Sequence, residues 1–76
     1  MDPEDIRQRI QKALPDAVVE LEDLTGGRDH WKAEVTSAAF QGKSSIARHR
    51  MVYQALGEWM RGPIHALALE TRTPDE

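Results

Sequence analysis

The sequence contains no cysteine and few aromatic residues, with two tryptophans, one tyrosine and one phenylalanine. Without cysteine, the chain can form no disulfide and no thiolate metal site of its own. No run approaches the ~20 apolar residues that span a bilayer, and the acidic start MDPEDIRQRI differs from the basic start of a signal peptide. We therefore expect a cytoplasmic protein, or one from an equivalent reducing compartment, without a membrane segment.

The 76 residues suffice for one domain, and a hydrophobic content of 39% with 30% charged residues is typical of a globular chain. Because so short a chain buries only ~60% of its unfolded surface, its core must be thin, such as helices on one face of a sheet. The net charge of −3 is uneven, since residues 26–62 carry six bases and three acids. This distribution suits a protein partner of mixed charge better than nucleic acid, which needs a broad basic face.

The first half of the sequence predicts a helix followed by a β-hairpin. Asp2 can cap a helix that begins at Pro3 and ends near Pro15. Its apolar residues at helical spacing are Ile6, Ile10, Ala13 and Leu14. Residues 17–24 and 31–36 then alternate apolar and polar side chains around the turn residues Gly26 and Gly27, which predicts two antiparallel strands.

The second half predicts a long helix and a third strand. The helix should begin after Ser44 or Ser45 and continue to about Arg61, where Gly62 and Pro63 end it. Its apolar stripe is Ile46, Val52, Tyr53, Leu56, Trp59 and Met60. Residues 64–71 are apolar on both faces, which predicts a covered strand with a parallel partner. The polar tail, residues 72–76, should fray.

The histidines are the main candidates for a site. His30 lies where the glycine loop meets the second strand, His65 at the start of the third strand, and His49 in the long helix. Imidazole binds iron, zinc and copper, but two histidines complete no common protein site, so a metal bound by His30 and His65 needs ligands from another molecule. The alternative, favoured by spacing alone, is that His65 is a partly buried strand residue satisfied by a backbone hydrogen bond.

A basic group, Lys43, Arg48, His49 and Arg50, surrounds the start of the long helix. It can contact a phosphate or an acidic partner, helped by the positive potential of the helix N-terminus; the alternative is an ordinary solvated helix face. The sequence has no P-loop, no GxGxxG and no nucleophile elbow. We therefore predict a binding protein and no enzyme.

The clearest motifs are Arg48–Leu56 (RHRMVYQAL), Ile64–Leu69 (IHALAL) and Thr71–Pro74 (TRTP), with weaker ones at Ile6–Leu14 and Phe40–Ser44. Together these segments resemble the BolA/IbaG-like family. The similarity covers nearly the whole chain, so residues 1–76 are interpreted as a single BolA-like domain.

The resemblance implies an α+β fold of order α-β-β-α-α-β, similar to a type II KH domain. This fold has a three-stranded mixed sheet, helices on one face and a short extra helical turn near Phe40 to Ser45. The resemblance also implies a partner, a monothiol glutaredoxin of the CGFS type, and a [2Fe–2S] cluster shared with that glutaredoxin and glutathione. His65 matches the family's C-terminal histidine ligand, and His30 is the only histidine available near the loop that supplies the second ligand.

These implications give two functional hypotheses. The first is a binding module for iron–sulfur cluster trafficking or iron sensing, with a free chain that is a monomer or weak dimer and holds no cofactor alone. The second is a KH-like, DNA-binding transcriptional regulator that uses the basic group. Against the second, KH domains clamp nucleotides with a GxxG loop, and the run Gly42–Ser45 (GKSS) lacks the second glycine.

Overall fold

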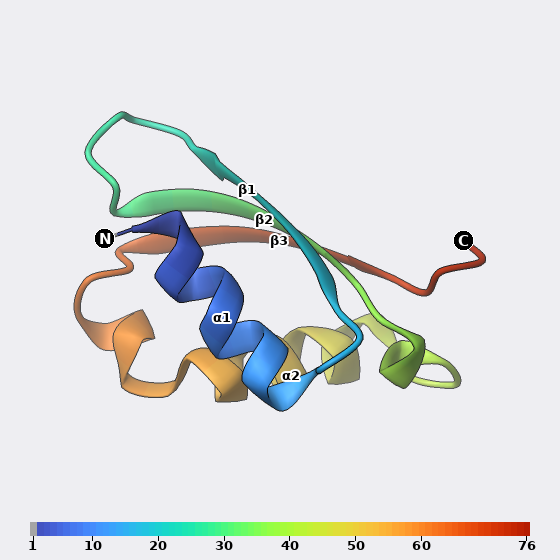
Figure 1. Ribbon diagram of the computed structural model, residues 1–76. Helices are drawn as coiled ribbons and strands as arrows, with labels where there is room; N and C mark the ends of the chain where they lie inside the picture. Colours follow the sequence, from blue (N-terminus) through green and yellow to red (C-terminus); the bar gives the residue numbers. More distant parts are fainter. Residues whose placement is uncertain (1) are drawn as a thin grey trace.

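The computed structural model describes residues 2–76 and has an α+β architecture, as predicted. Its elements, in chain order, are α1 (Pro3–Ala13), β1 (Val18–Asp23), β2 (His30–Thr36), the 3-10 turn η1 (Ala38–Phe40), α2 (Ser45–Leu56), the 3-10 turn η2 (Gly57–Arg61) and β3 (Ala66–Arg72). The sheet order is β1-β2-β3, with β1 antiparallel and β3 parallel to β2. Both α-helices lie on the same face of this mixed sheet (Figure 1).

Helix α1 begins as the sequence predicts. The side chain of Asp2 accepts a hydrogen bond of 2.9 Å from the backbone N–H of Glu4, and Pro3 occupies the first turn. Ile6 and Ile10 are fully buried against the sheet, whereas Ala13, which we placed on the same apolar face, is exposed. The helix therefore packs through a narrow stripe of large side chains.

The hairpin of β1 and β2 contributes the buried side chains on the sheet side of the core. In β2 the side chains of Trp31, Ala33 and Val35 point toward the helices and are buried, while the residues between them lie on the uncovered face. The antiparallel pairing of Val19 with Val35 places the buried Val19 of β1 beside them. The predicted hairpin and the side-chain alternation of both strands are confirmed.

The predicted single helix from residue 44 or 45 to Arg61 is wrong in its second part. Helix α2 ends at Leu56, because Gly57 adopts a φ of 56° and donates its N–H to the carbonyl of Tyr53. Residues 57–61 continue as the 3-10 turn η2. The predicted apolar stripe is also too wide, since Val52 and Leu56 are buried but Ile46 is 70% exposed.

The predicted covered strand at residues 64–71 is corrected as well. Strand β3 begins at Ala66 and lies at the edge of the sheet. Leu67 and Leu69 pack against the core, whereas Ala66 and Ala68 are exposed on the uncovered face. Alanine is small enough to tolerate either environment, so its presence on the second face did not signify burial.

The short extra helical turn implied near Phe40 to Ser45 is the 3-10 turn η1, which lies slightly earlier in the chain. The side chain of Ser37 caps this turn, and Phe40 is fully buried. At the C-terminus, Thr73 is buried and its hydroxyl lies 2.7 Å from the carboxylate of Asp75. The prediction that residues 72–76 fray is therefore wrong for Thr73, which is buried and hydrogen-bonded. Neither helix of residues 2–76 has the length and apolar character needed to cross a bilayer.

The positive φ of Gly57 generates the first testable prediction. We expect Gly57→Ala to lower the free energy of unfolding by ~1–2 kcal/mol, because an L-residue is strained at this backbone conformation. Urea denaturation measures the change. Gln54→Ala, an exposed substitution within α2, is the control and should stay within about 0.5 kcal/mol of the unmodified chain. Equal stability of both variants would contradict the prediction.

A second prediction concerns Asp16, whose carboxylate accepts hydrogen bonds of 2.7 Å from the hydroxyl of the buried Ser37 and from the N–H of Ala38. The Ser37 hydrogen bond, followed by that of Ala38, lowers the pKa of Asp16 below its usual 3.8. Since the folded-state pKa is depressed, the stabilisation is fully present above the unfolded-state pKa and is lost as the pH falls through the folded-state value.

Asp16→Asn should therefore lower the melting temperature at pH 7 and reduce the further loss between about pH 4 and pH 2. Thermal unfolding followed by circular dichroism at several pH values measures both effects. Glu22→Gln, which removes one negative charge from an exposed position in β1, should keep the acid dependence of the unmodified chain. An unchanged acid dependence in Asp16→Asn would show that the ionisation of Asp16 does not contribute to stability.

Candidate metal-binding site

The parallel pairing of β2 and β3 brings two of the three histidines together. Parallel strands begin at the same end of a sheet, and here His30 is the first residue of β2 and pairs with Ala66, the first residue of β3. His65 directly precedes β3. The two imidazole rings consequently lie edge to face, with centroids 5.8 Å apart and planes 81° apart.

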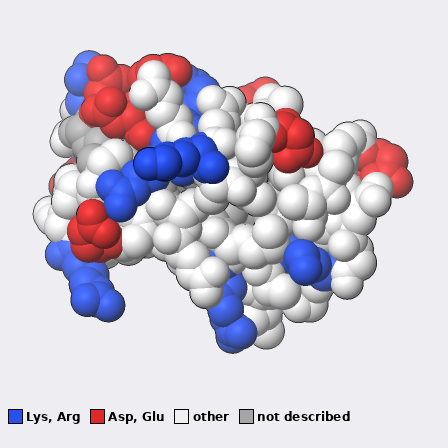
Figure 2. Space-filling model, turned by 60° about the horizontal axis from the view of Figure 1, so that its bottom comes forward, with Lys and Arg blue, Asp and Glu red and all other residues white. Residues whose placement is uncertain are grey.

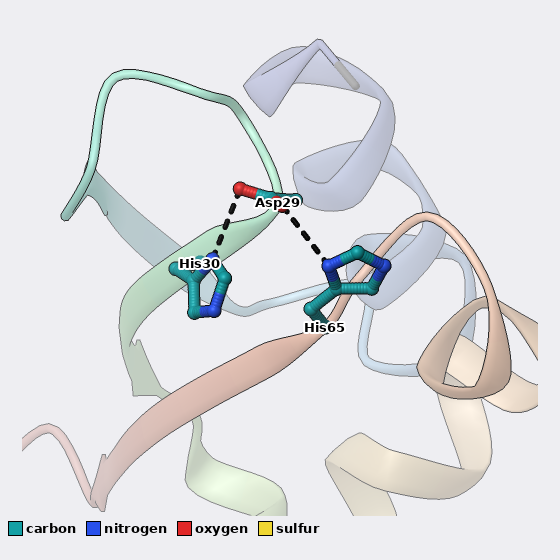
Figure 3. Close-up of side chains that lie close together, drawn as sticks. All are labelled: Asp29, His30 and His65. Atoms are coloured by element: carbon teal, nitrogen blue, oxygen red, sulfur yellow. Dashed lines mark hydrogen bonds and ion pairs between the residues drawn. The ribbon is translucent and has the colours of Figure 1, made fainter.

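The carboxylate of Asp29 lies between these rings, as Figure 3 shows. Its Oδ1 is 3.0 Å from Nδ1 of His30, and its Oδ2 is 3.0 Å from Nδ1 of His65. The hydrogen bond with His30, aided by the charges of His30 and His65, lowers the pKa of Asp29 below 3.8. The group is therefore a carboxylate at neutral pH, and it holds one nitrogen of each ring.

Sequence reasoning missed Asp29. The available signal was its position directly before His30, but an acidic residue beside a histidine is common and specifies no site. Only the register of β2 with β3 shows that the same carboxylate also reaches His65.

The backbone fixes the relative positions of the three residues. The carbonyl oxygen of Asp29 accepts hydrogen bonds from the N–H groups of His65, at 2.8 Å, and Ala66, at 3.3 Å. The preceding loop is also ordered, because the carboxylate of Asp23 accepts hydrogen bonds from the N–H groups of Gly26, at 2.9 Å, and Arg28, at 3.2 Å. The three side chains thus project from a well-defined backbone at the end of the sheet.

The site is open to solvent and to other molecules. The side chain of His65 is 64% exposed and that of His30 is 40% exposed. Burial of the His65 ring would have excluded a ligand role toward a second molecule. The alternative prediction, that His65 is a partly buried strand residue, is wrong. The ring of His65 is exposed, and the residue lies just before the start of β3.

The donor set consists of two imidazole nitrogens and one carboxylate oxygen. One donor atom from each residue can be chosen so that all three lie within 4.8 Å of one another. Nitrogen and oxygen donors of this kind suit zinc, iron, copper and nickel. The arrangement therefore fits a metal centre that leaves coordination positions for ligands from elsewhere.

The predicted basic group does not form one surface. Nε of Arg48 donates to the carbonyl oxygens of Phe40, at 3.1 Å, and Lys43, at 3.0 Å, and its Nη1 lies 2.9 Å from the carboxylate of Glu76. The Arg48 side chain is consequently only 15% exposed and fastens α2 to its surroundings. Lys43 and Arg50 remain exposed.

His49 belongs to neither the metal-binding site nor the contacts of Arg48. Its ring packs edge to face against Tyr53 on α2, and it lines a shallow hollow with residues 69–72 of β3. These residues form the C-terminal end of β3, whereas His65 precedes its N-terminal end. His49 therefore lies at the opposite end of that strand from the site.

Figure 2 shows the molecule turned so that the bottom of Figure 1, where α2 lies, comes forward. The Lys and Arg side chains on this face occupy separate places, with acidic and uncharged side chains between them. This face of the protein offers no broad basic surface.

Comparison with known proteins agrees with this architecture. The family model "BolA-like protein" matches residues 8–76. BolA-like protein 1 of Mus musculus is 40% identical over an alignment of 76 positions. The alignment covers 91% of this chain and 56% of the mouse protein, so the chain spans about half the length of this relative. The "DNA-binding transcriptional regulator BolA" of Haemophilus influenzae is 35% identical over an alignment of 78 positions, which covers 93% of this chain and 76% of that protein.

A solved structure shows the same fold. The bolA protein homologue from Coxiella burnetii superimposes with a TM-score of 0.84 at 39% identity, covering 99% of this chain and 94% of that one. Its agreement extends across both helices and the three-stranded sheet, because nearly the whole of each chain is matched. The chain belongs to the BolA-like protein family.

Proposed function

We propose that this chain is a non-catalytic binding module that supplies histidine ligands to a [2Fe–2S] cluster shared with a monothiol CGFS glutaredoxin and glutathione. The observation that carries the proposal is the pair of exposed imidazoles, His30 and His65, at one end of the sheet. Such a role places the protein in iron–sulfur cluster trafficking or iron sensing, in the cytoplasm or an equivalent reducing compartment.

The residues present fit this cluster. A [2Fe–2S] centre can carry two histidines on one iron in place of two cysteines, which raises its reduction potential. This cysteine-free chain offers two histidines and leaves the thiolate ligands to the glutaredoxin cysteine and glutathione. When bound, the cluster would supply one-electron and cluster-transfer chemistry, while the residues of this chain would hold and orient it.

Asp29 has a specific part in this proposal. A carboxylate that holds one nitrogen of a histidine fixes the ring orientation and raises the basicity of the other nitrogen. Asp29 makes this contact with both His30 and His65. Both rings are thereby oriented before a partner arrives, which lowers the conformational entropy lost on binding.

The test mixes the chain with a CGFS glutaredoxin, ferrous iron, sulfide and glutathione under anaerobic conditions. We expect a heterodimer by size-exclusion chromatography and a visible circular dichroism spectrum that differs from that of the glutaredoxin alone. His65→Ala should remove this spectral difference, because the cluster loses a ligand from this chain.

His49→Ala is the matched histidine variant. It should retain the heterodimer's cluster spectrum, because His49 lies at the other end of β3 from the site. A weaker complex with an unchanged spectrum would identify His49 as a partner contact and not a ligand. Absence of any complex with the unmodified chain, with or without the cluster, would refute the proposal.

A second candidate function is nucleic-acid binding, which the name of the Haemophilus influenzae relative favours. In this chain Lys43 and Arg50 are the exposed cations of the basic group, since Arg48 is held by contacts within the protein. The separated charges in Figure 2 and the net charge of −3 weigh against tight binding of phosphates.

We therefore expect no gel shift with duplex DNA at physiological salt. Binding through a few phosphate contacts should emerge only at low ionic strength, because counterion release makes the affinity strongly salt-dependent. A shift at physiological salt that the double variant Lys43→Ala, Arg50→Ala abolishes would favour the regulator over the glutaredoxin partner. Glu22→Gln, on the uncovered sheet face, serves as the control variant.

A further inference from the structure

We infer that the free chain binds one divalent transition-metal ion, with zinc as the probe, through Asp29, His30 and His65. This inference goes beyond the proposed function, because it needs neither a glutaredoxin nor a cluster. Two histidines alone complete no common site, but the carboxylate adds a third protein ligand. Three protein ligands with an open fourth position are the usual composition of a catalytic-type zinc site.

The distances between the donor atoms are close to those that an ion requires. Zinc binds nitrogen and oxygen at roughly 2.0–2.2 Å, so adjacent ligands of a tetrahedral site lie roughly 3.3 Å apart. In the structure, each carboxylate oxygen of Asp29 lies 3.0 Å from Nδ1 of one histidine. The carboxylate faces the Nδ1 atoms of both rings (Figure 3), and one donor atom of each residue lies within 4.8 Å of the other two, so an ion would draw these donors together by rotation of the side chains.

The ion would take the place of the hydrogen bond between Asp29 and His30 and of the 3.0 Å contact between Asp29 and His65. A neutral imidazole that binds metal through Nδ1 carries its single proton on Nε2, so the proton moves from Nδ1 to Nε2 by exchange with solvent, with no net loss from the ring. The Asp29 carboxylate exchanges its imidazole partners for the ion. The two Nδ1 atoms face one common carboxylate, which makes this exchange a local rearrangement without backbone movement.

The backbone supports such a site. The hydrogen bonds from the N–H groups of His65 and Ala66 to the carbonyl of Asp29 hold the start of β3 against the end of the loop. On the other side, His30 is already part of the β2 ladder. Ligands on rigid strand ends are held more accurately than ligands on free loops, so little ordering entropy opposes binding.

The donor set also selects the class of ion. Two imidazoles and one carboxylate suit zinc, ferrous iron and other borderline divalent ions, whereas magnesium prefers oxygen ligands throughout. No thiolate is present to favour softer ions. Zinc is the suitable probe because it has no redox chemistry and accepts four-coordinate geometry.

An alternative is that the three residues form only an ion-pair network that supports the fold. His65 is well exposed and His30 is partly exposed, and ion pairs in contact with solvent contribute little to stability, ~0–1 kcal/mol. Backbone hydrogen bonds, not the imidazoles, hold β3 in register. The fold therefore does not require this arrangement, and the alternative predicts that zinc does not bind.

The experiment is a zinc titration of the purified full chain by calorimetry in a non-coordinating buffer at pH 7.5, with magnesium as a parallel arm. We expect one zinc ion per chain and no magnesium binding. Asp29→Asn, which keeps the size of the side chain, should weaken zinc binding at least ~10-fold. His30→Ala and His65→Ala should do the same, whereas His49→Ala should bind zinc as the unmodified chain does.

Far-UV circular dichroism establishes that each variant is folded, and Asp29→Asn remains informative if an alanine variant is not. The inference is overturned if the unmodified chain shows no saturable zinc binding, if Asp29→Asn binds as tightly as the unmodified chain, or if only His49→Ala loses binding. These outcomes are separable from those of the glutaredoxin experiment. Zinc binding without a glutaredoxin complex would refute only the proposed function, and a complex without zinc binding would refute only this inference.

Discussion

The parallel pairing of β2 with β3 is the constraint on which the candidate site depends. It places the first residues of two distant segments, His30 and Ala66, side by side. The carbonyl oxygen of Asp29 then accepts a hydrogen bond from the N–H of His65, which positions the His65 ring beside the His30 ring. A parallel neighbour requires a long crossover connection, and α2 with η2 provides it while covering the core face of the sheet. The same topology thus builds the core and assembles the donors.

A three-stranded sheet covered on one face leaves much of its surface accessible. In so small a domain the buried side chains, among them Trp31 and Phe40, fill the single layer between helices and sheet. The uncovered face and the strand ends carry the polar residues, including the three donors. A site at a strand end combines a fixed backbone with exposed side chains, which is the combination that a ligand shared between two molecules needs.

Asp29 connects the two proposals through different chemistry. If a cluster is shared, the carboxylate of Asp29 would orient both imidazoles through their Nδ1 atoms and leave Nε2 of each ring for the metal, as carboxylates commonly do for metal-binding histidines. Toward a single ion, the same carboxylate would coordinate directly beside the two rings. The choice depends on which ring nitrogens face the metal, and each role uses a contact of 3.0 Å that the free chain already makes. One side chain can therefore serve both states without a change of fold.

The sequence by itself determined the features that depend on local chemistry. The capping Asp2, the alternation in both hairpin strands and the apolar spacing of α1 predicted the start of the fold, because caps and periodicity act over a few residues. The motifs around Arg48–Leu56 and Ile64–Leu69 indicated the family and drew attention to His65. The absence of cysteine excluded thiolate ligands from this chain.

Only the tertiary structure decided the rest, because those features depend on contacts between distant segments. The edge position of β3 could not be read from alanines that tolerate both environments, and the end of α2 at Gly57 depended on a backbone angle. The sequence predicted Arg48 as a surface cation, but its side chain is bonded to the carbonyl of Phe40 and to the carboxylate of Glu76 within the protein. Above all, the meeting of Asp29, His30 and His65 is a consequence of strand register, which no local pattern in the sequence encodes.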